Sequence, residues 1–228
     1  MTRLRLAIGN KNYSSWSMRP WVLMKQAGID FQEVPVRFDS FDADSTFKSK
    51  VGQWSPAGRV PILLDGDLAV WDTLAIAEYL AESFPGHRLW PDDKAARARA
   101  RSVCAEMHSG FGALRSHFPM NIEASLPEIG TQALAEEPAV RADLARIVSM
   151  WGELLAQGKG PMLFGGFTIA DAFFAPIVMR IRTYGLPLDV ACSAYADAVV
   201  ALPSVRQWIA EACAEHDFLA FEEPYRKR

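Results

Sequence analysis

Strand-forming patterns are confined to residues 1–84 of this 228-residue chain, and this asymmetry limits the possible folds. Leu4–Ile8 alternates apolar and polar residues, as a half-buried strand does. A helical stretch follows from Trp21 and ends at Gly28, a typical C-terminal glycine. Phe31–Val36 then reads as a second strand. The chain therefore begins with a β-α-β unit.

A hairpin and a helix complete this first part. The runs Val60–Leu64 and Leu68–Trp71 flank an Asp-Gly turn, which is typical of two antiparallel strands. Asp72 opens a helix with an apolar stripe, and Pro85 ends it. With a short helix in the polar segment 38–53, the expected order is β-α-β-(α)-β-β-α.

The remaining residues show helical patterns and no strand pattern. The expected helices are 93–118, 137–157, one that begins at Thr168 with the capping-box form Thr-Ile-Ala-Asp, 193–201 and 203–215. The sequence therefore predicts an α/β domain over residues 1–84, a linker over 85–93 and an all-helical domain over 94–228.

Composition and charge exclude several classes of function. A net charge of −3 supplies no positive field for nucleic acid. The apolar run Ala172–Met179 is far shorter than the ~18–20 residues that cross a bilayer. Cys104, Cys192 and Cys213 lack the spacing of a zinc site or a disulfide framework, so we expect no metal. The first residues lack the pattern of a secretory signal, which predicts a cytoplasmic protein.

Hydroxyl groups gather in the loop Tyr13-Ser14-Ser15-Trp16-Ser17, just before the first helix. A helix N-terminus presents unpaired amide groups and favours an anion. Because Pro20 lacks an amide hydrogen, we expect it in the first turn, with Ser17 or else Trp16 as N-cap. Ser14 and Ser15 would then face a ligand as hydrogen-bond donors, and such donors can hold a bound thiolate.

Two other places combine with this loop. In Arg59-Val60-Pro61, a cis bond before Pro61 would expose the Val60 backbone to a ligand, although cis is the minority state of such bonds. Asp72 and Thr73 stand at a helix N-terminus, where they could cap the helix or bind a ligand.

Together these motifs resemble the soluble glutathione transferase family along essentially the whole chain. The resemblance implies a thioredoxin-like N-terminal domain followed by an all-helical one. The supporting segments are 14–19 (SSWSMR), 55–63 (SPAGRVPIL), 71–80 (WDTLAIAEYL) and 164–171 (FGGFTIAD).

The resemblance also implies roles for particular residues. Ser14 would donate a hydrogen bond to the glutathione sulfur, with Ser15, Tyr13 and Ser17 as alternatives. The Val60 backbone would pair with the cysteinyl part of glutathione. The γ-glutamyl end would bind Asp72 and Thr73, and the glycyl carboxylate would bind Arg59. The second substrate would lie between the domains, near Trp16, His108, Phe111, Arg115, Phe118 and Met120.

The serine pair is similar to that of the zeta class, which isomerises maleylacetoacetate. That class has a cysteine after the pair, where this chain has Trp16. We therefore expect a cytosolic homodimer that conjugates glutathione to a small electrophile. A glutathione-dependent cis-trans isomerase and a non-catalytic glutathione-binding protein are the alternatives.

Overall fold

A mixed sheet organises the N-terminal part of the protein. The structure, a computed structural model, describes residues 4–227. The strands are β1 (Leu4–Ile8), β2 (Phe31–Pro35), β3 (Ile62–Asp65) and β4 (Leu68–Val70), in the spatial order β2-β1-β3-β4. β1 runs parallel to β2 and antiparallel to β3, and β3 pairs antiparallel with β4. The expected order of elements along this part of the chain, β-α-β-α-β-β-α, is confirmed.

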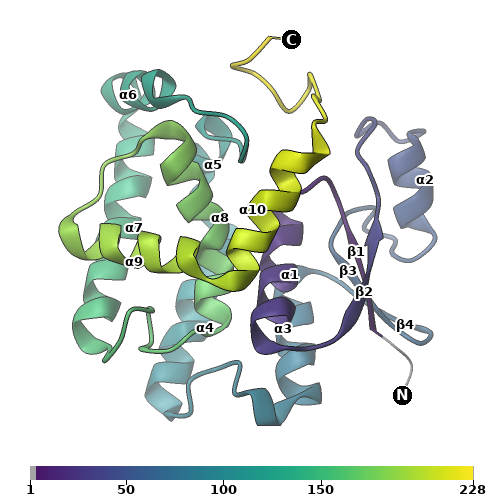
Figure 1. The fold of residues 1–228 in the computed structure, drawn as a ribbon, viewed down its shortest axis with the longest axis horizontal. Coiled ribbons are helices and arrows are strands. Elements are labelled where there is room, and N and C mark those ends of the chain that lie inside the picture. Colours follow the sequence, from purple (N-terminus) through teal and green to yellow (C-terminus); the bar gives the residue numbers. More distant parts are fainter. Residues whose placement is uncertain (1–3, 228) are drawn as a thin grey trace.

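The two faces of this sheet carry different helices (Figure 1). Leu6 and Ile8 are fully buried on the face that packs against α1 (Ser15–Ala27) and α3 (Thr73–Ser83). Ala7 belongs to a second cluster with Phe47 and Val51 of α2 (Thr46–Gly52). The alternation along β1 thus sorts its side chains between two apolar layers.

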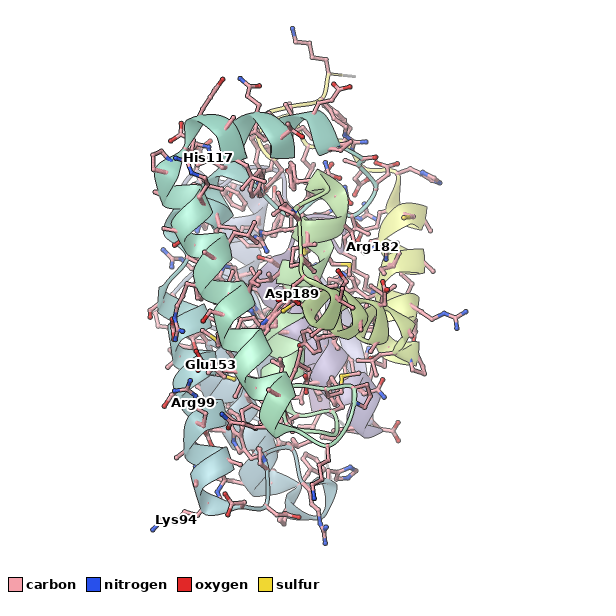
Figure 2. All side chains as sticks on the ribbon, turned by 90° about the vertical axis from the view of Figure 1, so that its left-hand side faces the viewer. Lys94, Arg99, His117, Glu153, Arg182 and Asp189 are labelled. Carbon is pink, nitrogen blue, oxygen red and sulfur yellow. The ribbon has the colours of Figure 1, made fainter. Side chains whose placement is uncertain are left out.

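The C-terminal part consists of helices, which confirms the predicted fold class. The linker contains a short 3-10 helix, η1 (Pro85–His87). The helices are α4 (Lys94–Ser109), α5 (Gly112–His117), α6 (Pro127–Glu136), α7 (Pro138–Gln157), α8 (Ile169–Tyr184), α9 (Val190–Ala201) and α10 (Pro203–Glu215). Figure 2 shows the outer face of this bundle, where Arg99 of α4 donates to Glu153 of α7 at 3.0 Å. No helix among residues 4–227 is both long and apolar enough to span a bilayer.

Helix α8 is buried along almost its whole length and forms the centre of the bundle. Its first turn has the predicted capping box: the Asp171 carboxylate accepts from the Thr168 N–H at 2.8 Å. The same carboxylate accepts from the Leu163 N–H at 3.1 Å. Asp171 therefore joins the loop before α8 to the start of the helix.

The predicted start of the first helix is wrong. α1 begins at Ser15, and its N-cap is Ser14 rather than Ser17 or Trp16. The Met18 N–H already donates to the Ser14 carbonyl at 3.1 Å, so a helical turn is complete before Pro20. Pro20 lies inside the helix, where it removes one backbone hydrogen bond.

Two other differences concern the helical part. The predicted helix 93–118 is divided into α4 and α5 at Gly110 and Phe111, because Phe111 adopts a left-handed conformation with φ of 56°. α6 was not predicted, although Pro127 stands in its first turn.

A C-terminal segment, residues 216–227, follows α10 and connects the two parts of the molecule (Figure 1). Its Phe221 ring packs against Phe41, before α2, with ring centroids 5.2 Å apart. Its Tyr225 hydroxyl donates to the His117 carbonyl of α5 at 2.9 Å. The segment therefore contacts both the sheet domain and the helical domain.

Candidate active site at the start of helix α1

A cavity of about 560 Å³ lies between the two domains at the start of α1. The serine loop, the region around α2, the turn before β3, helices α5 and α8 and the C-terminal segment all contribute to its wall. The lining residues are Tyr13, Ser14, Ser15, Trp16, Phe38, Phe41, Phe47, Lys48, Arg59, Val60, Gly112, Arg115, Ser116, Pro119, Met120, Arg180 and Glu222. This volume falls in the range of sites that hold small molecules.

Most of the predicted site residues line this cavity, and a second group lies outside its wall. Tyr13, Ser14, Ser15, Trp16, Arg59, Val60, Arg115 and Met120 are in the first group. Ser17, Asp72, Thr73, His108, Phe111 and Phe118 are in the second. The structure thus brings together residues from positions 13 to 120.

Ser14 and Ser17 form a hydrogen-bonded pair inside the protein. The Ser14 hydroxyl donates to Ser17 Oγ at 2.7 Å, and Ser17 Oγ also accepts from the Gly9 N–H at 3.1 Å. Ser17 is fully buried. Ser17 therefore connects α1 to the end of β1 and has a structural role.

Ser15 has a different partner, which comes from the helical domain. Its Oγ accepts from Arg180 Nη2 at 3.3 Å. Arg180 lies on α8 and is buried, and its Nε donates to the Phe118 carbonyl at 2.7 Å. Burial, followed by the charge of Arg115, lowers the pKa of the Arg180 guanidinium.

The Tyr13 hydroxyl is turned toward the C-terminal segment. It donates to Glu223 Oε1 at 2.7 Å, and the Leu219 N–H donates to it at 3.4 Å. Burial and then the hydrogen bond to Glu223 raise the pKa of Tyr13 to about 12. This phenol is therefore a poorer donor to a bound sulfur than its position in the loop suggested.

Trp16 lies among cationic side chains. The Arg19 guanidinium is 4.2 Å from the Trp16 ring centroid, and that of Arg115 is 5.1 Å away. Arg19 is buried, and its Nε and Nη1 have no hydrogen-bond partner in the part of the chain that is described. Burial, followed by the charges of Arg180 and Arg115, lowers the pKa of Arg19. The wall behind the serine loop is thus strongly positive.

The turn before β3 presents backbone to the cavity. The Val60–Pro61 peptide bond is cis, and Val60 is half-buried at the cavity wall. Arg59 is exposed at the rim. Lys48 of α2 donates to the Gly58 carbonyl at 2.8 Å and thereby holds this turn.

Asp72 and Thr73 begin α3 outside the cavity wall, and His108 links Asp72 to the lining residue Trp16. Asp72 Oδ1 accepts from the Leu74 N–H at 3.0 Å, so Asp72 caps the helix as predicted. Its Oδ2 lies 3.0 Å from His108 Nε2, and the His108 ring packs on Trp16 with centroids 5.0 Å apart. The Thr73 hydroxyl is buried without a hydrogen-bond partner in residues 4–227.

Sequence reasoning missed several residues of the wall, notably Arg180, Lys48 and Glu222. Arg180 had a usable signal, because an arginine inside the apolar run of α8 must find a polar partner. Glu222 had none, since its segment shows no pattern of its own. Burial raises the pKa of the Glu222 carboxyl to about 7, and the charge of Arg180 opposes that shift.

Two protein-family models match this chain. The family model "Glutathione S-transferase, N-terminal domain" matches residues 13–83, and "Glutathione S-transferase, C-terminal domain" matches residues 94–211. The maleylacetoacetate isomerase of Rattus norvegicus is 32% identical over 77% of this chain and 78% of its own length. A stringent starvation protein A homolog of Coxiella burnetii is 28% identical over 71% of this chain and 72% of its own.

Solved structures show the same relationship. A glutathione transferase homolog from Burkholderia, solved with bound glutathione, is 26% identical and covers 95% of this chain and 100% of its own, with a TM-score of 0.69. The two family models cover most of both domains, and the resemblance noted in the sequence is confirmed. The chain belongs to the glutathione S-transferase family.

Proposed function

We propose that this protein binds glutathione in the cavity at the start of α1 and conjugates its thiolate to a small electrophile. The observation that carries the proposal is the meeting of two serine hydroxyls, a helix N-terminus and the Val60 backbone in one cavity of a glutathione S-transferase chain. The solved Burkholderia homolog, which holds glutathione, supports it.

Each part of glutathione has a partner in this proposal. The sulfur lies against Ser14 and Ser15, and the cysteinyl backbone pairs with Val60, as an added strand does. The γ-glutamyl end reaches Asp72 and Thr73, where the buried Thr73 hydroxyl still lacks a partner. The glycyl carboxylate binds Arg59 or Lys48 at the exposed rim.

The protein's contribution to the chemistry is to favour the thiolate. The thiol loses its proton to solvent, the sulfur attacks the electrophilic carbon, and a leaving group such as chloride departs. If the hydroxyl donors and the helix N-terminus lower a thiol pKa from about 8.5 by about two units, the thiolate is bound more tightly than the thiol by about 2.7 kcal/mol. Arg115 and Arg180 add positive charge near the reacting carbon.

Retention on immobilised glutathione and turnover of a chloronitrobenzene acceptor test the proposal. We expect the wild type to be retained and active, and the double variant Ser14→Ala/Ser15→Ala to lose at least about tenfold in kcat/KM, or about 1.4 kcal/mol. Ser149→Ala, an exposed serine of α7, is the control. A wild type that is neither retained nor active contradicts the proposal.

Glutathione-dependent isomerisation is the second candidate function. The rat relative and a Caenorhabditis elegans relative, 28% identical over 77% of this chain, are a maleylacetoacetate isomerase and a probable one. Trp16, packed between Arg19, Arg115 and His108, stands where the resemblance implies a cysteine in that class. Isomerisation of maleylacetoacetate by the wild type, with no conjugation of the chloronitrobenzene, would favour this function.

We also propose that two copies of the chain assemble. Leu68 of the edge strand β4 and Trp71 after it are 49% and 40% exposed, and the two neighbouring apolar side chains are available to pack against a second copy. Light scattering should give the mass of two chains, and the mass of one chain would contradict this proposal. The cytosol is the proposed compartment, and fractionation of the producing cells tests it.

A further inference from the structure

The hydrogen bonds of the serine loop distinguish its two cavity-lining serines. A hydroxyl has a single proton to donate and two lone pairs to accept with. Ser14 donates its proton to Ser17 Oγ at 2.7 Å, inside the protein. To donate to a bound sulfur, Ser14 would have to break or reverse this internal hydrogen bond.

The Ser15 hydroxyl accepts a hydrogen bond from the protein instead of donating one. Its partner is Arg180 Nη2, at 3.3 Å, and a guanidinium has donors but no acceptor. Ser15 must therefore be the acceptor in this contact, and its own proton is not used there. Within the described residues its hydroxyl donates to no protein group, and Ser15 lines the cavity.

Arg180 is held rigidly enough to impose this direction. Its Nε donates to the Phe118 carbonyl at 2.7 Å, and its Nη1 donates to the Pro176 carbonyl at 3.3 Å. The side chain lies on the buried helix α8 and is itself 6% exposed. Two of the guanidinium nitrogens are thus held by backbone carbonyls, and the third, Nη2, contacts Ser15 of the serine loop.

The charge of Arg180 strengthens the effect. Across the described chain no carboxylate forms a contact ion pair with Arg180, although the Glu222 carboxyl of the cavity wall interacts electrostatically with it. A cationic donor polarises the hydroxyl that accepts from it, and the polarised hydroxyl donates more strongly.

We propose that Arg180 is a positioning residue for thiol activation: its guanidinium, held by the helical domain, turns the Ser15 hydroxyl so that Ser15 rather than Ser14 donates to the glutathione sulfur. This inference rests on the proposed function. It makes the ionisation of a thiol bound to the sheet domain dependent on a side chain 165 residues further along the chain.

The test is to measure the pKa of the bound glutathione thiol. The ultraviolet absorbance of the thiolate, recorded at a series of pH values, gives this pKa. Ser15→Ala and Arg180→Met should each raise this pKa by about one unit, a tenfold loss of thiolate below the pKa. Their combination should raise it no further than Ser15→Ala alone, since Arg180 acts through Ser15. Ser14→Ala should shift it less, and Arg180→Lys should restore part of the loss.

The control is Arg182→Met, an exposed arginine two residues further along α8 whose side chain lies on the outer part of the bundle (Figure 2). It should leave the thiol pKa unchanged. If Arg180→Met does not fold, the comparison of Ser15→Ala with Ser14→Ala still decides which serine is the donor.

The outcomes separate this inference from the proposed function. A wild type that does not bind glutathione overturns both. Bound glutathione whose thiol pKa rises in Ser14→Ala and stays unchanged in Ser15→Ala overturns the inference alone. Equal and additive shifts in Ser15→Ala and Arg180→Met also overturn it, because they show that Arg180 acts on the thiolate independently of Ser15.

Discussion

Of the described residues that line the cavity, Glu222 alone has a carboxylate. Burial raises its folded-state pKa from 4.5 to about 7. The folded protein therefore holds this proton more tightly than the unfolded chain does. The free energy of unfolding should fall as the pH rises from about 4.5 to about 7, and then level off.

The variant Glu222→Gln tests whether Glu222 causes this pH dependence of the free energy of unfolding. The variant should lose this part of the pH dependence and be more stable than the wild type at about pH 8, because its neutral amide needs no deprotonation. Urea unfolding at about pH 5 and about pH 8 measures it, with the exposed Glu128→Gln as control. A variant with the wild-type pH dependence would contradict the assignment.

The same scale shows what the sequence could and could not reveal about the site. Ser14, Ser15 and Val60 were found because short motifs place them next to a helix start and a strand start. The direction of their hydrogen bonds depends on Arg180, and contact between residues so far apart along the chain is not encoded in a local pattern. Asp72 caps α3, as its place before the helix allowed, and its contact with His108 joins residues too far apart for a local pattern to show.

At the scale of single helices, two N-terminal caps differ sharply in burial. Asp171 of α8 is fully buried and accepts from the N–H groups of Leu163 and Thr168. Asp189 of α9 is exposed and accepts from the Cys192 N–H at 2.7 Å.

Replacing each cap by alanine should give different losses of stability. Asp171→Ala leaves buried amide groups unpaired, so we expect a loss of about 3 kcal/mol or more, against about 1 kcal/mol for Asp189→Ala. Chemical denaturation of both variants gives the comparison. Equal losses would show that burial does not determine how much each carboxylate contributes to the free energy of unfolding.

The sequence predicted some helix boundaries and not others. Caps and periodicity located α8 and α10 because their boundary residues act locally, as Thr168 and Pro203 do. The start of α1 was misplaced because Pro20 was expected in the first turn, whereas the structure holds it inside a helix that begins at Ser15. The break between α4 and α5 depends on Phe111, a residue type with no preference for a positive φ.

At the scale of the whole molecule, the C-terminal segment ties the cavity to both domains. On the sheet side, Tyr13 holds the segment through Glu223 and Leu219, and Asn10 and Arg37 hold it through Asp217. Glu223 is buried and also accepts from Asn121 Nδ2 at 2.8 Å. The segment therefore depends on the serine loop for part of its order.

Tyr13→Phe should loosen this segment without removing the thiol donor. A lost hydrogen bond to a charged group costs about 1.5–3 kcal/mol, so amide exchange over residues 217–226 should become faster. Conjugation at saturating glutathione should stay within about threefold of the wild type, or about 0.7 kcal/mol. Loss of the thiolate signal in Tyr13→Phe, with unchanged exchange, would make Tyr13 the donor instead.

The central claim is that the cavity at the start of α1 binds glutathione and ionises its thiol. The most direct measurement is the thiolate absorbance of the wild-type complex across a pH titration. We predict an apparent thiol pKa about two units below the usual value of about 8.5. A bound thiol that keeps its ordinary pKa, or a protein that shows no saturable binding of glutathione, would contradict the account.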